Sequence, residues 1–269
     1  MRSTKKLLKL IFSDYLISKF AGISYGWHGN YNSWESAKVK CTGYDEINIL
    51  NRVLETSRKV KSKEIAFERD SVPFEKIEYS FPLLAGLIWI AYQNEGKLNV
   101  MDYGGSLGTT YFQNLVFLNS LSEVHWCVIE QPHFVMEGQH SFSDDKLEFF
   151  NSSEECLKMY QIDMVLLSNI IHYMEKPFAF LEEIISKNIK YIFIDRTLLL
   201  PGQKDRLTIQ KVPKKIYKAK YCCWFLSESR FLELLLDKYD LIFDFNISGN
   251  INIKSLFKGY LFRRKDKIS

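Results

Sequence analysis

The chain has 269 residues, of which 46% are hydrophobic, so it is long enough to bury a large core. Its net charge of +4 is small, and its basic residues are interleaved with acidic ones, which argues against a nucleic-acid-binding surface and a nucleic-acid partner. The 5 cysteines show no C-x-x-C spacing, so we expect no metal site and a reducing, cytoplasmic compartment.

The first 20 residues form a charged and apolar stretch. Lys9 and Asp14 interrupt its apolar run, which excludes a signal peptide. The apolar positions that approximate one helix face are Leu8, Ile11, Tyr15, Ile17 and Phe20. Such a helix packs either on the protein core or on the inner face of a membrane beside anionic lipid, and both interpretations stay open.

Residues 25 to 44 combine aromatic side chains, glycines and a histidine without helical or strand periodicity. Loops of this composition are seldom plain connectors. One interpretation is that its aromatic side chains stack on a sugar or form a lid over the cofactor, with His28 and Tyr31 as acceptor-binding candidates; the other is that they hold N-terminal helices on the core, Trp34 in particular. The aromatic residues concerned are Trp27, Tyr31, Trp34 and Tyr44. The longest apolar run elsewhere, residues 81 to 92, is about 12 residues long and too short to span a bilayer.

The chain changes character after residue 96. Residues 1–96 look mostly helical or irregular, whereas residues 97–269 alternate short apolar runs with amphipathic stretches. That alternation is typical of a doubly wound α/β sheet, so we predict an N-terminal helical or lid segment and a Rossmann-like domain with five parallel strands and a terminal antiparallel hairpin. The predicted strands are residues 98–103, 124–130, 147–150, 164–168 and 191–195, with hairpin strands at 241–245 and 256–263.

The first predicted strand ends in an acid and a glycine-rich loop. Gly104, Gly105 and Gly108 allow the backbone to approach a ligand that side chains would otherwise block. The second strand ends at Glu130, close to the roughly 20-residue offset at which an acid meets ribose hydroxyls. Because Asp102 precedes the glycines, its carboxylate would repel a diphosphate and could hold a cationic amino-acid group. S-adenosylmethionine carries that group and a ribose, and it has no phosphate.

Five parallel strands, a glycine loop after the first of them and a terminal hairpin resemble the layout of class I S-adenosylmethionine-dependent methyltransferases, over residues 97 to 263. Several segments also resemble a bacterial methyltransferase family that is linked to surface-polysaccharide gene clusters. They are GNYNSWESA at residues 29–37, GYD at 43–45, DYGG at 102–105, EQP at 130–132 and DRT at 195–197. The resemblance implies a methyltransferase, and its genomic setting implies a glycan substrate.

The resemblance implies roles for side chains at the carboxyl ends of the strands, where ligands bind in such sheets. The glycine loop is expected at the methionine group, Asp102 near its ammonium directly or through water, and Glu130 at both ribose hydroxyls. The remaining cofactor-binding candidates are Tyr103, Gln131, Asn151, Ser152, Ser168 and Asn169. Asn151 stands where many related enzymes carry an acid, and a helix cap is its alternative role.

Methyl transfer depends largely on positioning, with a general base when the acceptor is a hydroxyl. His172 follows the fourth strand, which lies beside the transferred methyl in class I enzymes, and is the first candidate for that catalytic base. A helix-surface or capping histidine is its alternative role, and His28, His133 and His140 compete with it. His125 is expected to be structural.

Asp195 and Arg196 end the fifth strand at the same edge of the sheet. Either Arg196 binds an anionic acceptor while Asp195 orients it or the base, or the two residues form a structural ion pair. Arg206 and Gln210 follow on an insertion, which either lines an acceptor groove for a phosphorylated glycan or is a solvated face. The other residues assigned to that groove are Lys214, Lys215, Tyr217 and Lys218.

These patterns predict a cytoplasmic S-adenosylmethionine-dependent O-methyltransferase that acts on a glycan or glycan precursor of a capsule or lipopolysaccharide. The methylated atom is a sugar hydroxyl or an oxygen of a phosphorus-containing decoration. One alternative is a degenerate methyltransferase fold that serves as a binding subunit of a glycan-assembly complex. The other, a nicotinamide-dependent sugar oxidoreductase, lacks a pyrophosphate-binding G-x-G-x-x-G frame and a Tyr-x-x-x-Lys pair after the fourth strand.

Overall fold

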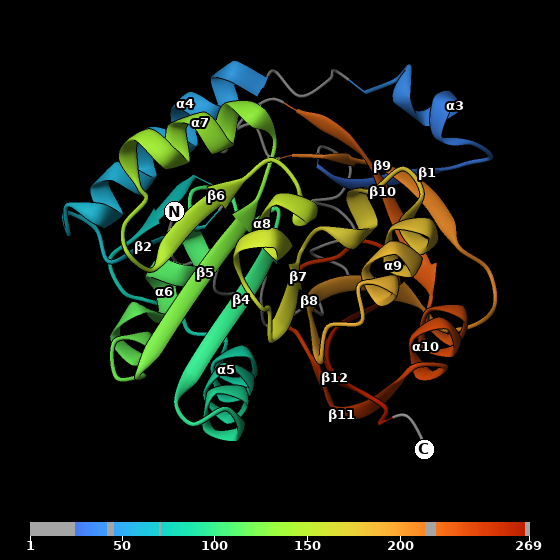
Figure 1. The fold of residues 1–269 in the computed structure, drawn as a ribbon. Helices are drawn as coiled ribbons and strands as arrows, with labels where there is room; N and C mark the ends of the chain where they lie inside the picture. Colours follow the sequence, from blue (N-terminus) through green and yellow to red (C-terminus); the bar gives the residue numbers. More distant parts are fainter. Residues whose placement is uncertain (1–24, 42–45, 70, 213–218, 267–269) are drawn as a thin grey trace, which may run out of the picture.

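A computed structural model of the chain describes residues 25–41, 46–69, 71–212 and 219–266 (Figure 1). The predicted N-terminal helix and the basic residues at 214–218 lie outside these ranges. So does the predicted GYD segment at 43–45. Among the described residues, a ten-stranded sheet runs through the molecule, and a two-stranded hairpin lies apart from it.

The central part of the sheet is parallel and carries the predicted strands in the order β6-β5-β4-β7-β8. Their bounds are β4 Lys97–Tyr103, β5 Glu123–Ile129, β6 Leu147–Phe150, β7 Met164–Ser168 and β8 Tyr191–Leu200. The chain leaves β4 toward β5 on one side and returns to β7 on the other. The carboxyl end of β4 therefore lies at the point where the strand order reverses, which is where ligands bind in open α/β sheets.

The terminal hairpin forms as predicted from strands β11 Tyr239–Asn246 and β12 Leu256–Arg264. Strand β12 pairs antiparallel with β8, with Tyr260 opposite Ile194, and so lies between β8 and β11. The predicted fold class, a Rossmann-like sheet of five parallel strands with a terminal antiparallel hairpin, is confirmed.

The sheet continues beyond the predicted strands. β8 passes residue 195, where we expected it to end, and pairs briefly with β10 Lys220–Ser227. β10 is antiparallel to β9 Arg206–Lys211, and β9 is antiparallel to β1 Gly26–Tyr31. The sequence analysis did not predict β1 within residues 25–44 or β9 and β10 in the insertion, because pairing with distant segments of the sheet orders both stretches. The lid role of residues 25–44 stays a prediction.

Helices cover both faces of the parallel sheet (Figure 1). The helices whose side chains join the first core cluster are α4 Glu46–Lys61, α5 Phe81–Gln93, α6 Thr109–Leu118 and α7 Pro132–Ser141. Those that join the second are α8 Ser153–Met159, α9 Pro177–Ser186 and α10 Glu228–Leu236. The shorter elements are α3 Trp34–Lys38, the 3-10 turn η1 Ile171–Tyr173, and the hairpin β2 Phe67–Arg69 with β3 Val72–Phe74.

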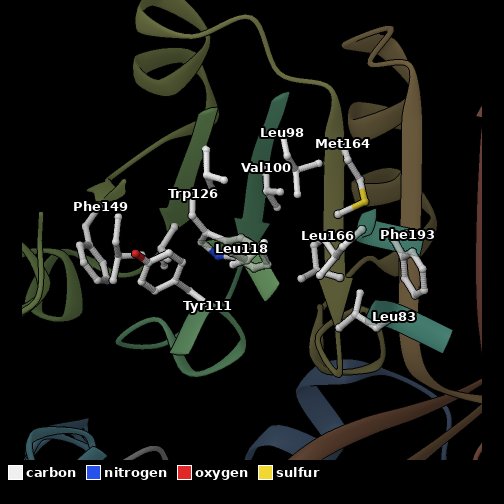
Figure 2. Packing of buried hydrophobic residues seen from close by; sticks show 14 of the residues in the cluster. Leu83, Leu98, Val100, Tyr111, Leu118, Trp126, Phe149, Met164, Leu166 and Phe193 are labelled. Carbon is white, nitrogen blue, oxygen red and sulfur yellow. The ribbon is translucent and has the colours of Figure 1, made fainter. Parts of the chain in front are cut away.

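Strand alternation divides the core between these two layers. Val100 of β4 and Trp126 of β5 point into the first cluster, where Figure 2 shows Trp126 beside Leu118 of α6, whereas Met101 and Cys127 belong to the second cluster. β4 and β8 are apolar on both faces because each is buried between two helical layers. Both sides of the boundary predicted after residue 96 thus contribute to one core, and that boundary stays a prediction.

The first described strand is connected to the last hairpin by a side-chain clamp. Asn252, in the loop between β11 and β12, accepts a hydrogen bond from the Trp27 backbone N–H at 2.8 Å and donates one to the Trp27 carbonyl at 2.9 Å. The Trp27 indole N–H also donates to the Cys223 thiol sulfur of β10 at 3.2 Å. β1 is therefore held at both its backbone and its side chain.

No helix within the described ranges combines the length and the apolar character that crossing a membrane requires. The described helix with the longest apolar run, α5, has 13 residues.

The hairpin supplies a test of core packing. A Cβ atom at Gly259 of β12 would collide with the ring of Phe245 on β11, which packs on the first core cluster. We expect Gly259→Ala to lower the free energy of unfolding by about 1–3 kcal/mol through overpacking, measured by urea denaturation. When Phe245 is replaced by Leu, Gly259→Ala should lower the free energy of unfolding by less than it does in the wild type. An equal cost in both backgrounds would contradict the assigned contact.

Candidate functional site

The glycine loop leaves β4 at the reversal point and turns sharply. The Gly104 N–H donates to the carbonyl of Ile129 at 2.9 Å, which fixes the start of the loop against the end of β5. A Cβ atom at Gly105 would lie 2.5 Å from Oδ2 of Asp102, so the loop passes directly over that carboxyl group. Gly108 has a φ of +87° as it begins α6, a conformation that glycine adopts without strain. A side chain is therefore excluded at residue 105 by the Asp102 carboxyl and disfavoured at residue 108 by its positive φ, whereas the backbone hydrogen bond of Gly104 fixes the start of the loop.

Asp102 is buried beneath the loop, with 1% of its surface exposed. Its Oδ2 accepts a hydrogen bond from the indole N–H of Trp126 at 3.0 Å. Burial raises the pKa of Asp102 to about 7, while the Trp126 hydrogen bond acts in the opposite direction. The carboxyl group therefore lies directly beneath the loop. We predicted that Asp102 contacts a cofactor ammonium either directly or through water, and its burial favours the contact through water.

Glu130 follows β5 and faces the same loop. One carboxylate oxygen accepts the Ser106 N–H at 3.3 Å, and the other accepts the Gln131 N–H at 2.8 Å. Burial raises its pKa, and the two backbone hydrogen bonds partly offset that effect. Because each carboxylate oxygen has a second lone pair, Glu130 keeps the capacity to accept two further hydrogen bonds from a diol.

The other predicted cofactor residues lie along the same edge of the sheet. Tyr103 points to the opposite face from Asp102 and packs edge-on against Phe180, with ring centroids 5.4 Å apart. After β6, Ser152 caps α8 by accepting the Glu155 N–H at 3.2 Å. The helix-cap alternative for Asn151 is therefore wrong, because its neighbour occupies the cap position, and Asn151 itself is exposed.

Three side chains form a polar cluster at the end of β7 and the middle of β8. The Ser168 hydroxyl donates to Oδ2 of Asp195 at 3.1 Å, and Nη2 of Arg196 donates to the Ser168 oxygen at 2.8 Å. Nε of Arg196 lies 3.1 Å from Oδ2 of Asp195, within ion-pair range, but that N–H is not aligned for a hydrogen bond. The predicted ion pair is thus present, and the acceptor-binding role of Arg196 stays a prediction.

The backbone is strained at this cluster. Arg196 has a φ of +55° and Asn169 a φ of +58°, a region that side chains other than glycine seldom adopt. The pairing of β8 with β12 shifts register here, so residues 195 and 196 form a bulge opposite Gly259. The bulge allows Arg196 to turn back toward Ser168, and 28% of the Arg196 side chain remains exposed. Strain of this kind is concentrated at functional sites.

His172 lies in η1, beside this cluster, and has 1% of its surface exposed. Burial lowers its pKa to about 3, and the nearby charge of Arg196 contributes in the same direction. Its Nδ1 atom has no hydrogen-bond partner. The imidazole is therefore neutral at physiological pH, and an acceptor would have to enter the protein interior to reach it.

Four of the predicted acceptor-binding residues lie on β1 and β9. They are His28 and Tyr31 from residues 25–44, and Arg206 and Gln210 from the insertion. Arg206 donates through both Nε and Nη2 to the Gly29 carbonyl, at 3.0 and 2.8 Å, and so connects β9 to β1. Gln210 accepts a hydrogen bond from the Tyr173 hydroxyl at 2.6 Å, which links β9 to η1.

His28 and Tyr31 occupy β1 itself. Burial lowers the pKa of His28, and its Nε2 atom has no hydrogen-bond partner. The ring of Tyr31 lies under the ammonium group of Lys40, 4.9 Å from its centroid. Of the acceptor-binding candidates, the structure brings Gln210 into contact with η1 and gives Arg206 a structural contact, whereas the acceptor role of all four stays a prediction.

Sequence reasoning missed two residues that shape the site. Trp126 fixes Asp102, and Glu68 of β2 accepts hydrogen bonds from the Thr109 hydroxyl at the start of α6 and from the Ser71 N–H. Glu68 is buried, and a carboxylate at a helix N-terminus is stabilised by the helix dipole. Trp126 could have been found from the pairing of β4 with β5, because Trp126 lies opposite Val100 and therefore on the same face of the sheet as Asp102. No local signal indicated Glu68.

Within the described ranges, no three histidine, cysteine, aspartate or glutamate residues are grouped so that they could hold a metal ion.

No family model matches this chain, and no curated protein matches it. It is similar to the magnesium protoporphyrin IX methyltransferase of Synechocystis PCC 6803 with bound S-adenosylmethionine, at 14% identity, over 94% of this chain and 98% of that one, with a TM-score of 0.46. It is also similar to the N-terminal domain of EvdMO1, crystallised with S-adenosylhomocysteine and D-fucose, at 13% identity over 82% and 97% of the two chains, with a TM-score of 0.45.

A third similar structure is 1,6-didemethyltoxoflavin-N1-methyltransferase of Burkholderia thailandensis with S-adenosylhomocysteine. Its identity to this chain is 13% over 84% of this chain and 92% of that one, with a TM-score of 0.43. In each case the bound molecules belong to those proteins.

The ionisation of Asp102 generates a prediction about stability. Its pKa of about 7 in the folded protein exceeds the ordinary value of 3.8, so the folded state binds this proton more tightly than the unfolded state does. The contribution of Asp102 to stability is therefore complete below about pH 4 and is lost as the pH rises through about 7, at up to about 1.4 kcal/mol per pH unit.

Asp102→Asn removes this titration while keeping an acceptor for Trp126. We expect the free energy of unfolding of the variant, minus that of the wild type, to rise between about pH 4 and 7 and then to level off. Urea denaturation across this range measures the difference. Asp145→Asn, on an exposed aspartate before β6, is the control and should follow the wild-type profile. Parallel profiles for Asp102→Asn and the wild type would contradict the assignment.

Proposed function

We propose that this protein is an S-adenosylmethionine-dependent methyltransferase. The observation that carries the proposal is the hydrogen bond between Glu130 and the Ser106 N–H, which holds an acidic side chain beside a glycine loop at the reversal point of the sheet. The glycine loop lets a ligand approach the backbone closely, and the Glu130 carboxylate can accept two further hydrogen bonds. Together these features suit a nucleoside that carries an amino-acid group.

The residues fit that cofactor in position and chemistry. The backbone at Gly104 and Gly105 would approach its methionine group, supported by Asp102 from below. Glu130 would accept both ribose hydroxyls, and Asn151, exposed after the end of β6, would meet the adenine. The loop itself argues against a dinucleotide, because Asp102 lies beneath it and opposes the charge of a diphosphate.

When bound, S-adenosylmethionine supplies a methyl group on a sulfonium that leaves as a neutral thioether. The protein then has to position the acceptor oxygen and remove its proton. Ser168, Asp195 and Arg196 form one wall of the proposed acceptor site. They lie on β7 and β8, and β7 is the neighbour of β4, which the glycine loop follows. His172, neutral and behind this wall, is the residue that we propose to accept the proton.

We further propose that the acceptor is a glycan or glycan precursor of the cell surface and that the enzyme works in the cytoplasm. The partly exposed guanidinium of Arg196 supports an anionic acceptor. The glycan class, the narrower bacterial family and contact with the inner face of a membrane rest on the sequence resemblance and the N-terminal segment.

One observation favours a second function, a methyltransferase fold retained as a binding subunit. A pKa of about 3 makes His172 a weak proton acceptor, and its imidazole is sealed from solvent. Cofactor binding without turnover on any acceptor would support this alternative.

Removal of the Glu130 carboxylate tests the cofactor assignment. We expect the wild type to bind S-adenosylhomocysteine with micromolar affinity, about −8 kcal/mol, and Glu130→Ala to bind it about 10- to 100-fold more weakly, because hydrogen bonds to a charged group are lost. Isothermal titration calorimetry measures both, with NADH and NADPH as competing cofactor classes. Glu182→Ala, on the exposed side of α9, is the charge-matched control. Unchanged affinity in Glu130→Ala would refute the ribose assignment.

The role of His172 makes a separate prediction for turnover. With a substrate identified, His172→Gln should lower kcat about 100-fold while the KM for S-adenosylmethionine stays unchanged, because general-base catalysis contributes on the order of 100- to 10,000-fold. Since burial lowers the pKa of His172 to about 3, the wild-type rate should show no step near pH 6.5 from this residue. His125→Gln, in β5 against the ring of Tyr160, is the control. Full turnover in His172→Gln would exclude His172 as the base.

A further inference from the structure

Two cysteines far apart in sequence touch each other between α3 and β10. The Sγ atoms of Cys41 and Cys222 are 3.4 Å apart, although the residues are separated by 181 positions. Cys41 lies three residues beyond Lys38, the end of α3, and Cys222 lies in β10, opposite Ile209 of β9. Both are free thiols and belong to the small apolar cluster under α3. This contact lies outside the proposed methyltransferase site and was not indicated by cysteine spacing.

The two thiols differ in accessibility. Cys41 is partly exposed, whereas 7% of Cys222 is exposed. The remaining cysteines are fully buried. A reagent in solution therefore reaches Cys41 first.

Strand geometry separates this pair from the neighbouring cysteine. Cys223 follows Cys222 in β10, so its side chain points to the opposite face of the sheet. There its sulfur accepts the Trp27 indole N–H, within a different apolar cluster. The interacting pair Cys127 and Cys156 lies within the second core cluster with no exposed surface. Cys41 and Cys222 are thus the pair that combines contact with access.

We propose that Cys41 and Cys222 are a site of reversible disulfide formation with low-molecular-weight disulfides such as oxidised glutathione. The Cys41 thiolate attacks one sulfur of the small disulfide, forms a mixed disulfide and releases one small thiol. The Cys222 thiolate then attacks the Cys41 sulfur, forms the intramolecular bond and releases the second small thiol. Two protein thiols are oxidised, one small disulfide is reduced to two thiols, and a reducing thiol in excess reverses both steps.

The second step is the slow one at neutral pH. Burial is the main cause that raises the pKa of Cys222 to about 12, so only a small fraction of this thiol is ionised near pH 7. Closure of the disulfide also requires the sulfur atoms to approach by on the order of 1 Å, which a residue in the turn after a five-residue helix can supply. The intramolecular step should accelerate as the pH rises.

The disulfide would fix residues 33–41 on the three-stranded extension of the sheet. α3 packs on β9 and β10 through Ala37, and it is held at its start by the reciprocal hydrogen bonds of Ser33 and Ser36. A covalent bond at its end would close a loop of 181 residues and restrict the unfolded chain. Oxidation should therefore raise the melting temperature without displacing α3.

The full-length protein, treated with oxidised glutathione and then alkylated, tests this site. Before alkylation, we expect the intact mass of the oxidised protein to lie about 2 Da, the mass of two hydrogens, below that of the reduced protein. After alkylation, non-reducing peptide mapping should identify one crosslinked peptide that contains Cys41 and Cys222. The reaction should be faster at about pH 9 than at pH 7, and dithiothreitol should restore both the mass and the melting temperature.

Two variants separate the steps. Cys222→Ser should accumulate a stable glutathione adduct on Cys41, whereas Cys41→Ser should form neither adduct nor crosslink. The buried pair Cys127 and Cys156 is the internal control and should be alkylated only after denaturation. An adduct on wild-type Cys41 that persists at about pH 9, where the Cys222 step should be faster, or a crosslink that contains Cys223, would overturn the assignment. If Cys222→Ser does not fold, the wild-type peptide map and Cys41→Ser still decide it.

Discussion

The structure of the proposed cofactor site depends on a carboxyl group buried beneath a glycine loop. Asp102 points into the core because strand alternation places it on the same face as Val100, and Trp126 meets it there with an indole N–H. The loop above it can take only a path without a side chain at residue 105. That path brings the Ser106 N–H to Glu130. The burial of one polar group thus orients the ends of two strands.

A second constraint acts in the middle of β8. The bulge at Asp195 and Arg196 places Arg196 in the left-handed region, and Gly259 lies opposite it on β12, where Phe245 of β11 occupies the space that a side chain would need. In return, Arg196 turns toward Ser168 instead of continuing the alternation of the strand. The apolar strands of the central sheet therefore carry their polar groups at one edge, where the backbone departs from regular geometry.

The central sheet could be predicted from sequence because its strands are marked locally. β6 and β7 have the predicted bounds, β4 begins one residue earlier than predicted, and β5 is shifted by one residue at both ends. Apolar runs flanked by turn residues define these strands without reference to their partners. β1 could not be recognised, because Gly26 and Gly29 adopt positive φ and interrupt its alternation, and its order comes from β9 and Asn252. β9 and β10 depend in the same way on each other.

The site shows the same division. Position at the carboxyl ends of strands follows from the order of apolar runs, so the placement of Glu130 and Ser168 was predictable. Burial of His172, the contact of Arg206 with the Gly29 carbonyl and the position of Glu68 under Thr109 are tertiary facts with no local pattern. Each joins segments that only the folded chain brings together.

The clamp between Asn252 and Trp27 has a consequence for the order of folding during synthesis. Its two hydrogen bonds join residues 225 positions apart, so β1 can be completed only after the ribosome has released nearly all of the chain. β4, β5 and β6 pair with near neighbours and can assemble earlier, since contacts between near neighbours cost less loop-closure entropy. β1, made before the other described strands, is thus among the last to dock, and until then its backbone lacks the two hydrogen bonds to Asn252.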